Sequence, residues 1–190
     1  PVQPRERAQL RRELRQRVEF LRGALPDAGL PDFSDTQLLA TLEHWLAPSL
    51  ADKRRLDALR SEELSNALGS QLDYATRRLL DEHAPVTVSV PSGMDRRIDY
   101  SSGLVPVLAV KLQERFGLAE TPRIARGRVA LTLHLLSPAA RPIQVTQDLH
   151  GFWERTYPEV KKELKGRYPK HPWPDDPWTA VATHRAKPRR

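Results

Sequence analysis

The stretch Pro85–Val90 reads PVTVSV, and the spacing of apolar residues changes at this point. Apolar and polar side chains alternate from Val86 to Val90, which is the period of a half-buried β-strand. The turn sequence PSG follows at 91–93 and alternation resumes over 97–100, which together predict a β-hairpin. Before Pro85 the apolar residues recur with helical spacing. The sequence therefore predicts the α+β class, with a helical N-terminal half followed by a small mixed β/α unit.

Residues 1–84 are expected to form a helical region. From 5 to 25 apolar side chains recur every three or four positions, which is the pattern of an amphipathic helix. A second helix is expected to begin after Ser34, because SDTQ has the form of a capping box, and to end at Pro48. Shorter helices are expected at three further places: over 52–59, from Ser61 to Leu68, and over 72–83.

Residues 85–168 are expected to form a mixed α/β C-terminal domain, for which an OB-like fold is one candidate. Alternation over 129–135 predicts a further strand. A helix is predicted over 106–117, where proline suits the first position and apolar residues lie four apart. Another is predicted over 158–166. Residues 169–190 are rich in proline and basic residues, and we expect an extended tail.

The chain is basic, since 31 Lys and Arg face 24 Asp and Glu, a net charge of +7 at pH 7. The excess is uneven, because residues 154–190 hold ten basic and five acidic side chains, a balance of +5. Such a segment suits a polyanion, since each phosphate that it neutralises releases condensed counterions. The alternative is a tail that only keeps the protein in solution.

Cysteine is absent, which excludes disulfides, thiolate catalysis and Cys-ligated zinc. No apolar run approaches the roughly 18 residues of a membrane span, and no signal peptide is visible. We therefore expect a cytoplasmic protein with no membrane partner. The chain begins at Pro1 and its only methionine is Met94, so we expect a piece of a longer protein.

The sequence lacks the motifs of an ATPase. No GxxxxGK[ST] string occurs, so there is no phosphate loop. DEHA at 81–84 resembles a DEAH box with two letters exchanged, but it ends an amphipathic pattern, and we interpret it as a helix C-terminus. The histidines lack zinc spacing, and Asp175 and Asp176 lie in PDDP, an ordinary turn sequence. We expect no catalytic residue, metal site or cofactor in this chain.

The segment 161–173 interleaves basic and aromatic residues. Basic side chains contact phosphates and rings stack on unpaired bases, so this combination favours single-stranded nucleic acid such as RNA. The candidate nucleic-acid-binding residues are Lys161, Lys162, Lys165, Arg167, Tyr168, Lys170, His171 and Trp173. The alternative is that Tyr168 and Trp173 clamp the tail onto the domain while the lysines are merely solvated.

Long strings between Pro91 and Pro177 resemble the C-terminal region of bacterial HrpB-type ATP-dependent RNA helicases. They include, in the same order, VPSG, RIDYS, PVLAVKLQERFGL, LLSPAARPIQVTQDL, KKELKGRYPKH and WPDDP. The resemblance implies a DEAH-box helicase of superfamily 2, in which two RecA-like domains upstream hydrolyse ATP and move along RNA. ATP and Mg are then expected for the parent helicase and not for this chain.

Two functions are consistent with the sequence. The first is a non-catalytic accessory region of an RNA helicase that binds or positions single-stranded RNA, with the upstream helicase domains as partners in cis. The alternative is a protein-interaction or intramolecular packing module of the helicase. Salt distinguishes them, because binding to phosphates weakens steeply with ionic strength whereas apolar docking changes little.

Overall fold

The computed structural model describes residues 4–51, 53, 55, 58–102 and 105–186. The chain divides into two compact units, which we call unit 1 (Pro1–Pro85) and unit 2 (Val86–Arg190). Unit 1 is helical where it is described, and unit 2 contains a mixed sheet and helices. The predicted α+β class is therefore confirmed.

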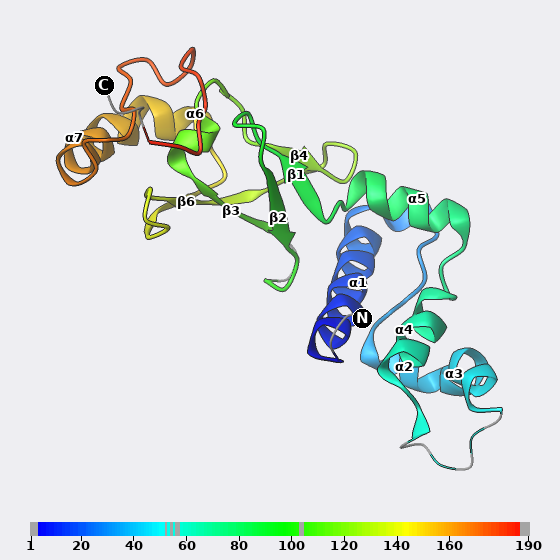
Figure 1. Ribbon diagram of the computed structural model, residues 1–190. Coiled ribbons are helices and arrows are strands. Elements are labelled where there is room, and N and C mark those ends of the chain that lie inside the picture. Colours follow the sequence, from blue (N-terminus) through cyan, green and yellow to red (C-terminus); the bar gives the residue numbers. More distant parts are fainter. Residues whose placement is uncertain (1–3, 52, 54, 56–57, 103–104, 187–190) are drawn as a thin grey trace. The chain divides into compact units, whose positions relative to one another are not determined.

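Unit 1 contains five α-helices and a short 3-10 turn among its described residues (Figure 1). They are α1 Pro4–Ala24, the turn Pro26–Ala28, α2 Asp35–Ala40, α3 Leu42–Leu50, α4 Ser61–Gly69 and α5 Tyr74–His83. Helix α1 has the predicted amphipathic character, since it buries Val18 and Leu21. Half of the residues in the helix predicted over 52–59 lie outside the described part of the chain.

The predicted capping box at Ser34 forms only in part. The Ser34 hydroxyl accepts a bond from the Gln37 backbone N–H at 3.3 Å, while Asp32 rather than Gln37 accepts from the Ser34 N–H. The predicted end at Pro48 was wrong. Helix α2 ends at Ala40, and α3 continues past Pro48 to Leu50 at the cost of one backbone hydrogen bond.

Two of the contacts that hold the described part of unit 1 together join helices far apart in the sequence. One cluster joins α3 to α4 and consists of Trp45, Leu46 and Ala67, with partly buried leucines around it. The other contact joins α1 to the end of α5 through Arg17, which donates to the Ala84 carbonyl at 2.6 Å and pairs with Asp81 at 2.8 Å. The DEHA string is therefore the C-terminus of a helix, as predicted, and its aspartate serves an ion pair within the fold.

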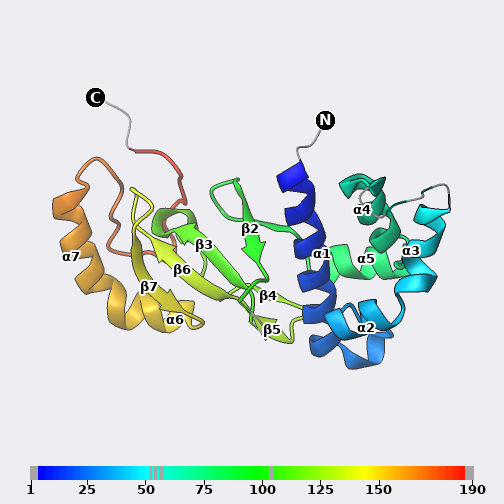
Figure 2. The ribbon, with the colours of Figure 1, turned by 90° about the horizontal axis from the view of Figure 1, so that it is seen from below.

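Unit 2 begins with the predicted hairpin, and α7 is the last helix of its described residues. Its strands are β1 Thr87–Ser89, β2 Asp95–Asp99, β3 Val107–Lys111, β4 Arg123–Ile124, β5 Val129–Ala130, β6 Thr132–Leu136 and β7 Pro142–Thr146. Its helical segments are a 3-10 turn at Leu112–Arg115, the short helix α6 Leu149–Gly151, a π-helical turn Phe152–Thr156 and α7 Tyr157–Arg167. Figure 2 shows β3, β6 and β7 next to one another, with α6 and α7 beside them.

The five-stranded sheet has the order β1-β2-β3-β6-β7, and β4 and β5 form a separate two-stranded sheet. All neighbours in the larger sheet are antiparallel except β3 and β6, which are parallel. No ladder joins β1 to β7 within the described residues, so the sheet has two edges. The OB-like fold, which is a closed or partly closed barrel, is not confirmed.

The helix predicted over 106–117 was wrong. Residues Val107–Lys111 form strand β3 at the centre of the sheet, followed by one 3-10 turn. Leu108 and Val110 are buried and Ala109 between them is exposed, which is the alternation of a strand. The spacing of four that suggested a helix arose because Leu112 and Phe116 are buried by the turn that follows the strand.

Residues 169–186 contain no helix or strand, and they fold back onto unit 2. Two backbone hydrogen bonds join this segment to the 3-10 turn and the residues just after it. Gly117 N–H donates to the Pro177 carbonyl at 2.9 Å, and Thr183 N–H donates to the Gln113 carbonyl at 3.0 Å. The predicted tail is therefore held against the domain over its described length. Its last basic residues, Lys187, Arg189 and Arg190, lie outside the described residues.

Candidate nucleic-acid interface

All of the positive charge excess belongs to unit 2. This unit holds 18 Lys and Arg against 10 Asp and Glu, a balance of +8, whereas unit 1 holds 13 against 14, a balance of −1. A polyanion is attracted to the surface with the higher density of positive charge. If the chain binds nucleic acid, unit 2 is therefore the better candidate.

The predicted binding residues lie on and just after helix α7. Lys161, Lys162, Lys165 and Arg167 belong to the helix, and Tyr168 follows it as the C-cap. The helix ends there because Gly166 weakens its last turn and Pro169 cannot continue it. Lys165 and Arg167 in that last turn also face the negative end of the helix dipole.

Three of these basic side chains form ion pairs within the unit. Lys161 pairs with Asp175, Lys162 with Glu159 at 3.3 Å, and Arg167 with Glu163 at 3.5 Å. The bond from Lys161 holds the pKa of Asp175 below its usual range. These pairs reduce the charge that the helix offers to a phosphate.

Lys165 and Lys170 are the two basic residues of the predicted set that pair with no acidic side chain among the described residues. Both side chains are exposed, and neither forms an ion pair within the described part of the chain. They are therefore the lysines of this segment most available to a phosphate backbone.

The aromatic residues of the predicted set point inward. Trp173 is only 8% exposed, and its indole N–H donates to the Tyr168 carbonyl at 2.9 Å. The Tyr168 hydroxyl lies 3.5 Å from that of Ser137. His171 is half-buried, and burial together with the charge of Lys111 lowers its pKa. Trp173 is therefore largely covered, and its bond to Tyr168 attaches the tail to the end of α7.

A different tryptophan lines a cavity beside α7. A cavity of about 450 Å³ lies between the start of α7 and the tail, and we call it the α7 pocket. Its lining residues are Trp153, Glu154, Tyr157, Pro158, Lys161, Lys162, Asp175, Pro177 and Trp178. The pocket thus combines aromatic rings with two of the predicted lysines.

The rings of the α7 pocket differ in how firmly they are fixed. Trp153 and Tyr157 are buried, meet edge to face at 5.2 Å, and donate to the Leu118 and Pro174 carbonyls respectively. Trp178 is half-buried, and its ring lies 4.7 Å from that of His150 at a tilt of 57°. Trp178 is therefore the ring of this pocket that a ligand can reach.

The pocket is suited to stacking more than to binding phosphate. Its two lysines are matched by Glu154 and Asp175, so its walls carry no net charge. Indole rings stack on any base, and a nearby ammonium group adds a cation–π or phosphate contact. The sequence pattern did not identify Trp178 as a binding residue, because its place beside α7 depends on the return of the tail.

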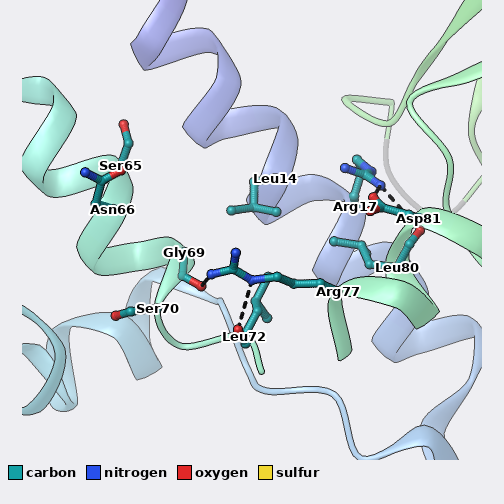
Figure 3. Close-up of a pocket in the computed structure, with 10 residues that line it drawn as sticks. All are labelled: Leu14, Arg17, Ser65, Asn66, Gly69, Ser70, Leu72, Arg77, Leu80 and Asp81. Atoms are coloured by element: carbon teal, nitrogen blue, oxygen red, sulfur yellow. Dashed lines mark hydrogen bonds and ion pairs between the residues drawn. The ribbon is translucent and has the colours of Figure 1, made fainter. Parts of the chain in front are cut away.

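Unit 1 has a second cavity, of about 460 Å³, among α1, α4 and α5 (Figure 3). Its two arginines form hydrogen bonds with backbone carbonyls at or near the ends of helices. Arg77 donates to the Gly69 carbonyl at 2.7 Å and to the Leu72 carbonyl at 3.0 Å, and Arg17 pairs with Asp81. Both arginines of this cavity are therefore engaged within the fold.

The described residues contain neither a metal site nor a membrane-spanning helix. No group of three or more His, Asp or Glu side chains there is arranged to hold a metal ion. None of the described helices is both long enough and apolar enough to cross a membrane.

Comparison with known proteins gives consistent matches. The family model described as "ATP-dependent helicase C-terminal" (HrpB_C) matches residues 45–177. The ATP-dependent RNA helicase HrpB of Escherichia coli K12 is 46% identical over 175 residues, which are 92% of this chain and 22% of that protein.

Two solved structures are similar to this one. The crystal structure of the E. coli DExH-box NTPase HrpB has a TM-score of 0.86 and 45% identity, and the match covers 93% of this chain and 22% of that one. That of the Escherichia coli DEAH/RHA helicase HrpB has a TM-score of 0.70 and 43% identity, over 85% and 20%. This chain thus spans about a fifth of the relatives that it matches. The resemblance seen in the sequence is confirmed, and the chain belongs to the HrpB family of ATP-dependent helicases, as its C-terminal part.

Proposed function

We propose that this chain is a non-catalytic accessory region of an ATP-dependent RNA helicase, and that unit 2 binds or positions single-stranded RNA. The E. coli relative is named an ATP-dependent RNA helicase, which supports RNA as the ligand. ATP hydrolysis belongs, in this proposal, to helicase domains upstream in cis, because this sequence has no phosphate loop.

One observation supports the proposal: the half-buried ring of Trp178 lines the same cavity as Lys161 and Lys162. A base that enters the pocket stacks on the indole, and its phosphates lie near the ammonium groups. Lys165 and Lys170 extend the basic surface along α7 and the turn after it. The surrounding unit, with its balance of +8, attracts the strand from a distance.

The experiment is a titration of the chain with a fluorescein-labelled 15-nucleotide oligouridine. Stacking on an aromatic residue contributes about 1 to 3 kcal/mol per base, so Trp178→Ala should weaken binding roughly five- to a hundred-fold. Trp178→Phe keeps a ring and should retain most of the affinity. Tyr74→Ala is the matched control, because Tyr74 is an exposed aromatic residue of unit 1.

The lysines are tested through the salt dependence of the same titration. Each phosphate contact on a single strand contributes about 0.7 to the slope of log K against log salt, so Lys165→Ala with Lys170→Ala should flatten it by about one to one and a half. If Trp178→Ala and this double variant stay folded by circular dichroism and bind with unchanged affinity and slope, the proposal is wrong.

A protein-interaction or packing module remains the second candidate, and a feature of unit 1 favours it. Leu39 is 69% exposed and Tyr74 is 77% exposed, and Leu42 is also exposed. Exposed apolar side chains on short helices are typical of surfaces that dock on another domain or protein. Binding to isolated upstream helicase domains that is insensitive to salt and lost in Leu39→Asp would support this function for unit 1.

A further inference from the structure

Two basic residues of unit 2 lie at the end of the five-stranded sheet where the parallel strands β3 and β6 finish. Lys111 is the last residue of β3, and it lies opposite Leu136, the last residue of β6. Leu136 also lies opposite Pro142, the first residue of β7, so Arg141 precedes β7 at this same end. Neighbouring strands lie about 4.8 Å apart, so the backbones of β3 and β7 are roughly 10 Å apart across β6. We call this place the β3–β6 end.

The turn between β6 and β7 fixes the backbone of Arg141. The Ser137 N–H donates to the Arg141 carbonyl at 2.8 Å, and the Arg141 N–H donates to the Ser137 hydroxyl at 3.1 Å. Ala140 between them has φ 59°, a left-handed conformation that a residue with a Cβ rarely adopts. The side chain of Arg141 is exposed. It therefore extends into solvent from a turn that is held on both sides.

The segment after α7 reaches the same place. The Tyr168 hydroxyl lies 3.5 Å from that of Ser137, and the rings of Tyr168 and His171 lie 6.4 Å apart. Burial, and then the positive charge of Lys111, lower the pKa of His171. His171 is therefore within electrostatic range of the last residue of β3. These contacts bring together the end of β3, the β6–β7 turn and the residues that follow α7.

No carboxylate neutralises the two basic residues of the β3–β6 end. Neither Lys111 nor Arg141 forms an ion pair with any other described residue. The acidic residue nearest to Lys111 in sequence is Glu114, which pairs with Arg96 and accepts a bond from the Lys111 backbone N–H at 3.3 Å. Like charges without a counter-ion repel one another, and an anion bound between them removes that repulsion.

The chain around the β3–β6 end is also free of acidic residues. No Asp or Glu occurs over 121–147, which includes β6 and its turn, or over 164–174, which includes the segment after α7. Lys170 is exposed and lies between Tyr168 and His171, so basic residues continue from here to the end of α7. Ammonium and guanidinium groups bind phosphate oxygens through charge-assisted hydrogen bonds. A continuous basic surface of this kind suits a chain of phosphates.

We infer that the β3–β6 end binds the phosphodiester backbone of RNA, with Lys111 and Arg141 as its two phosphate contacts. This inference rests on the proposed function and adds a site to it, since neither residue lines the α7 pocket. The α7 pocket contributes base stacking, and the β3–β6 end contributes phosphate contacts that depend on salt.

The test is the double variant Lys111→Gln with Arg141→Gln, titrated with the labelled oligouridine between about 50 and 200 mM KCl. Each phosphate contact on a single strand contributes about 0.7 to the slope of log K against log salt, so the loss of two should flatten it by about 1.4. Arg12→Gln with Arg78→Gln is the matched control. It removes the same charge from exposed arginines of unit 1 and should leave the slope nearly unchanged.

A charge-keeping variant separates charge from folding. Lys111→Arg with Arg141→Lys retains both positive charges, so it should keep the slope of the unmodified chain. If it flattens the slope as much as the glutamine double variant does, the effect comes from a disturbed strand or turn and the inference is wrong. An unchanged slope in the glutamine double variant, or a change no larger than in the control, overturns it as well.

Inorganic phosphate tests whether the site takes a small anion instead. In the isotope-labelled chain at constant ionic strength, the oligouridine should shift the amide signals of Ser137 and Arg141 at a far lower concentration than phosphate does. Saturable binding of phosphate without any shift from the oligouridine would assign the site to a free anion and overturn the inference.

The two RNA sites can fail separately. If the glutamine double variant keeps its slope while Trp178→Ala weakens binding, the α7 pocket stands without the β3–β6 end. If the double variant flattens the slope and Trp178→Ala has no effect, the β3–β6 end stands and the stacking role of the pocket fails. If neither variant has an effect, both proposals fail.

Discussion

Arg115 has the largest fully buried side chain among the described residues. It is 1% exposed, and its Nε and Nη2 atoms have no hydrogen-bond partner there. The adjacent carboxylate of Glu114 pairs with Arg96 instead. Loss of hydration lowers the pKa of Arg115 to about 10. A buried charge without a partner destabilises the folded state, so this residue opposes the stability of unit 2.

We therefore expect Arg115→Met, which keeps the length of the side chain without its charge, to raise the free energy of unfolding by about 1 kcal/mol or more. Arg17→Met is the control, because Arg17 is nearly as buried but is bonded to Ala84 and Asp81, and its loss should lower that free energy. Urea unfolding followed by tryptophan fluorescence measures both. A loss of stability in Arg115→Met as large as that in Arg17→Met would show that Arg115 has a partner.

At the scale of elements, strand β3 can be checked by a substitution on its exposed face. Ala109 lies opposite His134 in the central parallel pair, and its side chain is exposed. We expect Ala109→Thr to raise the unfolding free energy by about 0.3 to 1 kcal/mol, since β-branched residues favour strands, and Ala109→Gly to lower it. A helix at this place would reverse the effect of threonine. The urea midpoints of the two variants decide between strand and helix.

Local patterns predicted the elements whose side chains follow one clear period. The alternation at Val86–Val90 and the helical spacing in α1 were each sufficient, because one face of each element is less exposed than the other. Strand β3 was mistaken for a helix because the turn after it extended the apolar spacing by chance. The short strand β4 and the edge strand β7 were not predicted at all, since two residues carry no period and most of the side chains of β7 are exposed.

The candidate site was predicted only in part for a related reason. The basic residues of α7 are adjacent in sequence, so their clustering is visible without a structure. Trp178 reaches the pocket only because the tail folds back onto α7, which depends on long-range bonds such as that from Tyr157 to Pro174. The choice between Trp173 as a clamp and Trp178 as the accessible ring likewise depends on burial, which a local pattern does not encode.

For the whole molecule, the contrast in charge between the two units leads to a prediction of where RNA lies. Unit 2 has a balance of +8 and unit 1 of −1. We expect a 4-thiouridine oligonucleotide, cross-linked by ultraviolet light and mapped by mass spectrometry, to label peptides from 86–186 and few from 4–85. Cross-links concentrated in unit 1 would contradict this assignment. Raising the salt should reduce the labelling of unit 2 in proportion to the loss of binding.

The parallel pairing of β3 with β6 has a consequence during protein synthesis. Val107 pairs with Thr132, so the two strands are 25 positions apart in the chain. At about 5 to 20 residues per second, a ribosome releases β3 roughly one to five seconds before its partner. During that interval the nascent chain exposes an unpaired, strongly apolar strand edge, on which another chain can add a strand. The emergence of β6 is therefore the step at which this domain passes from an aggregation-prone to a protected chain.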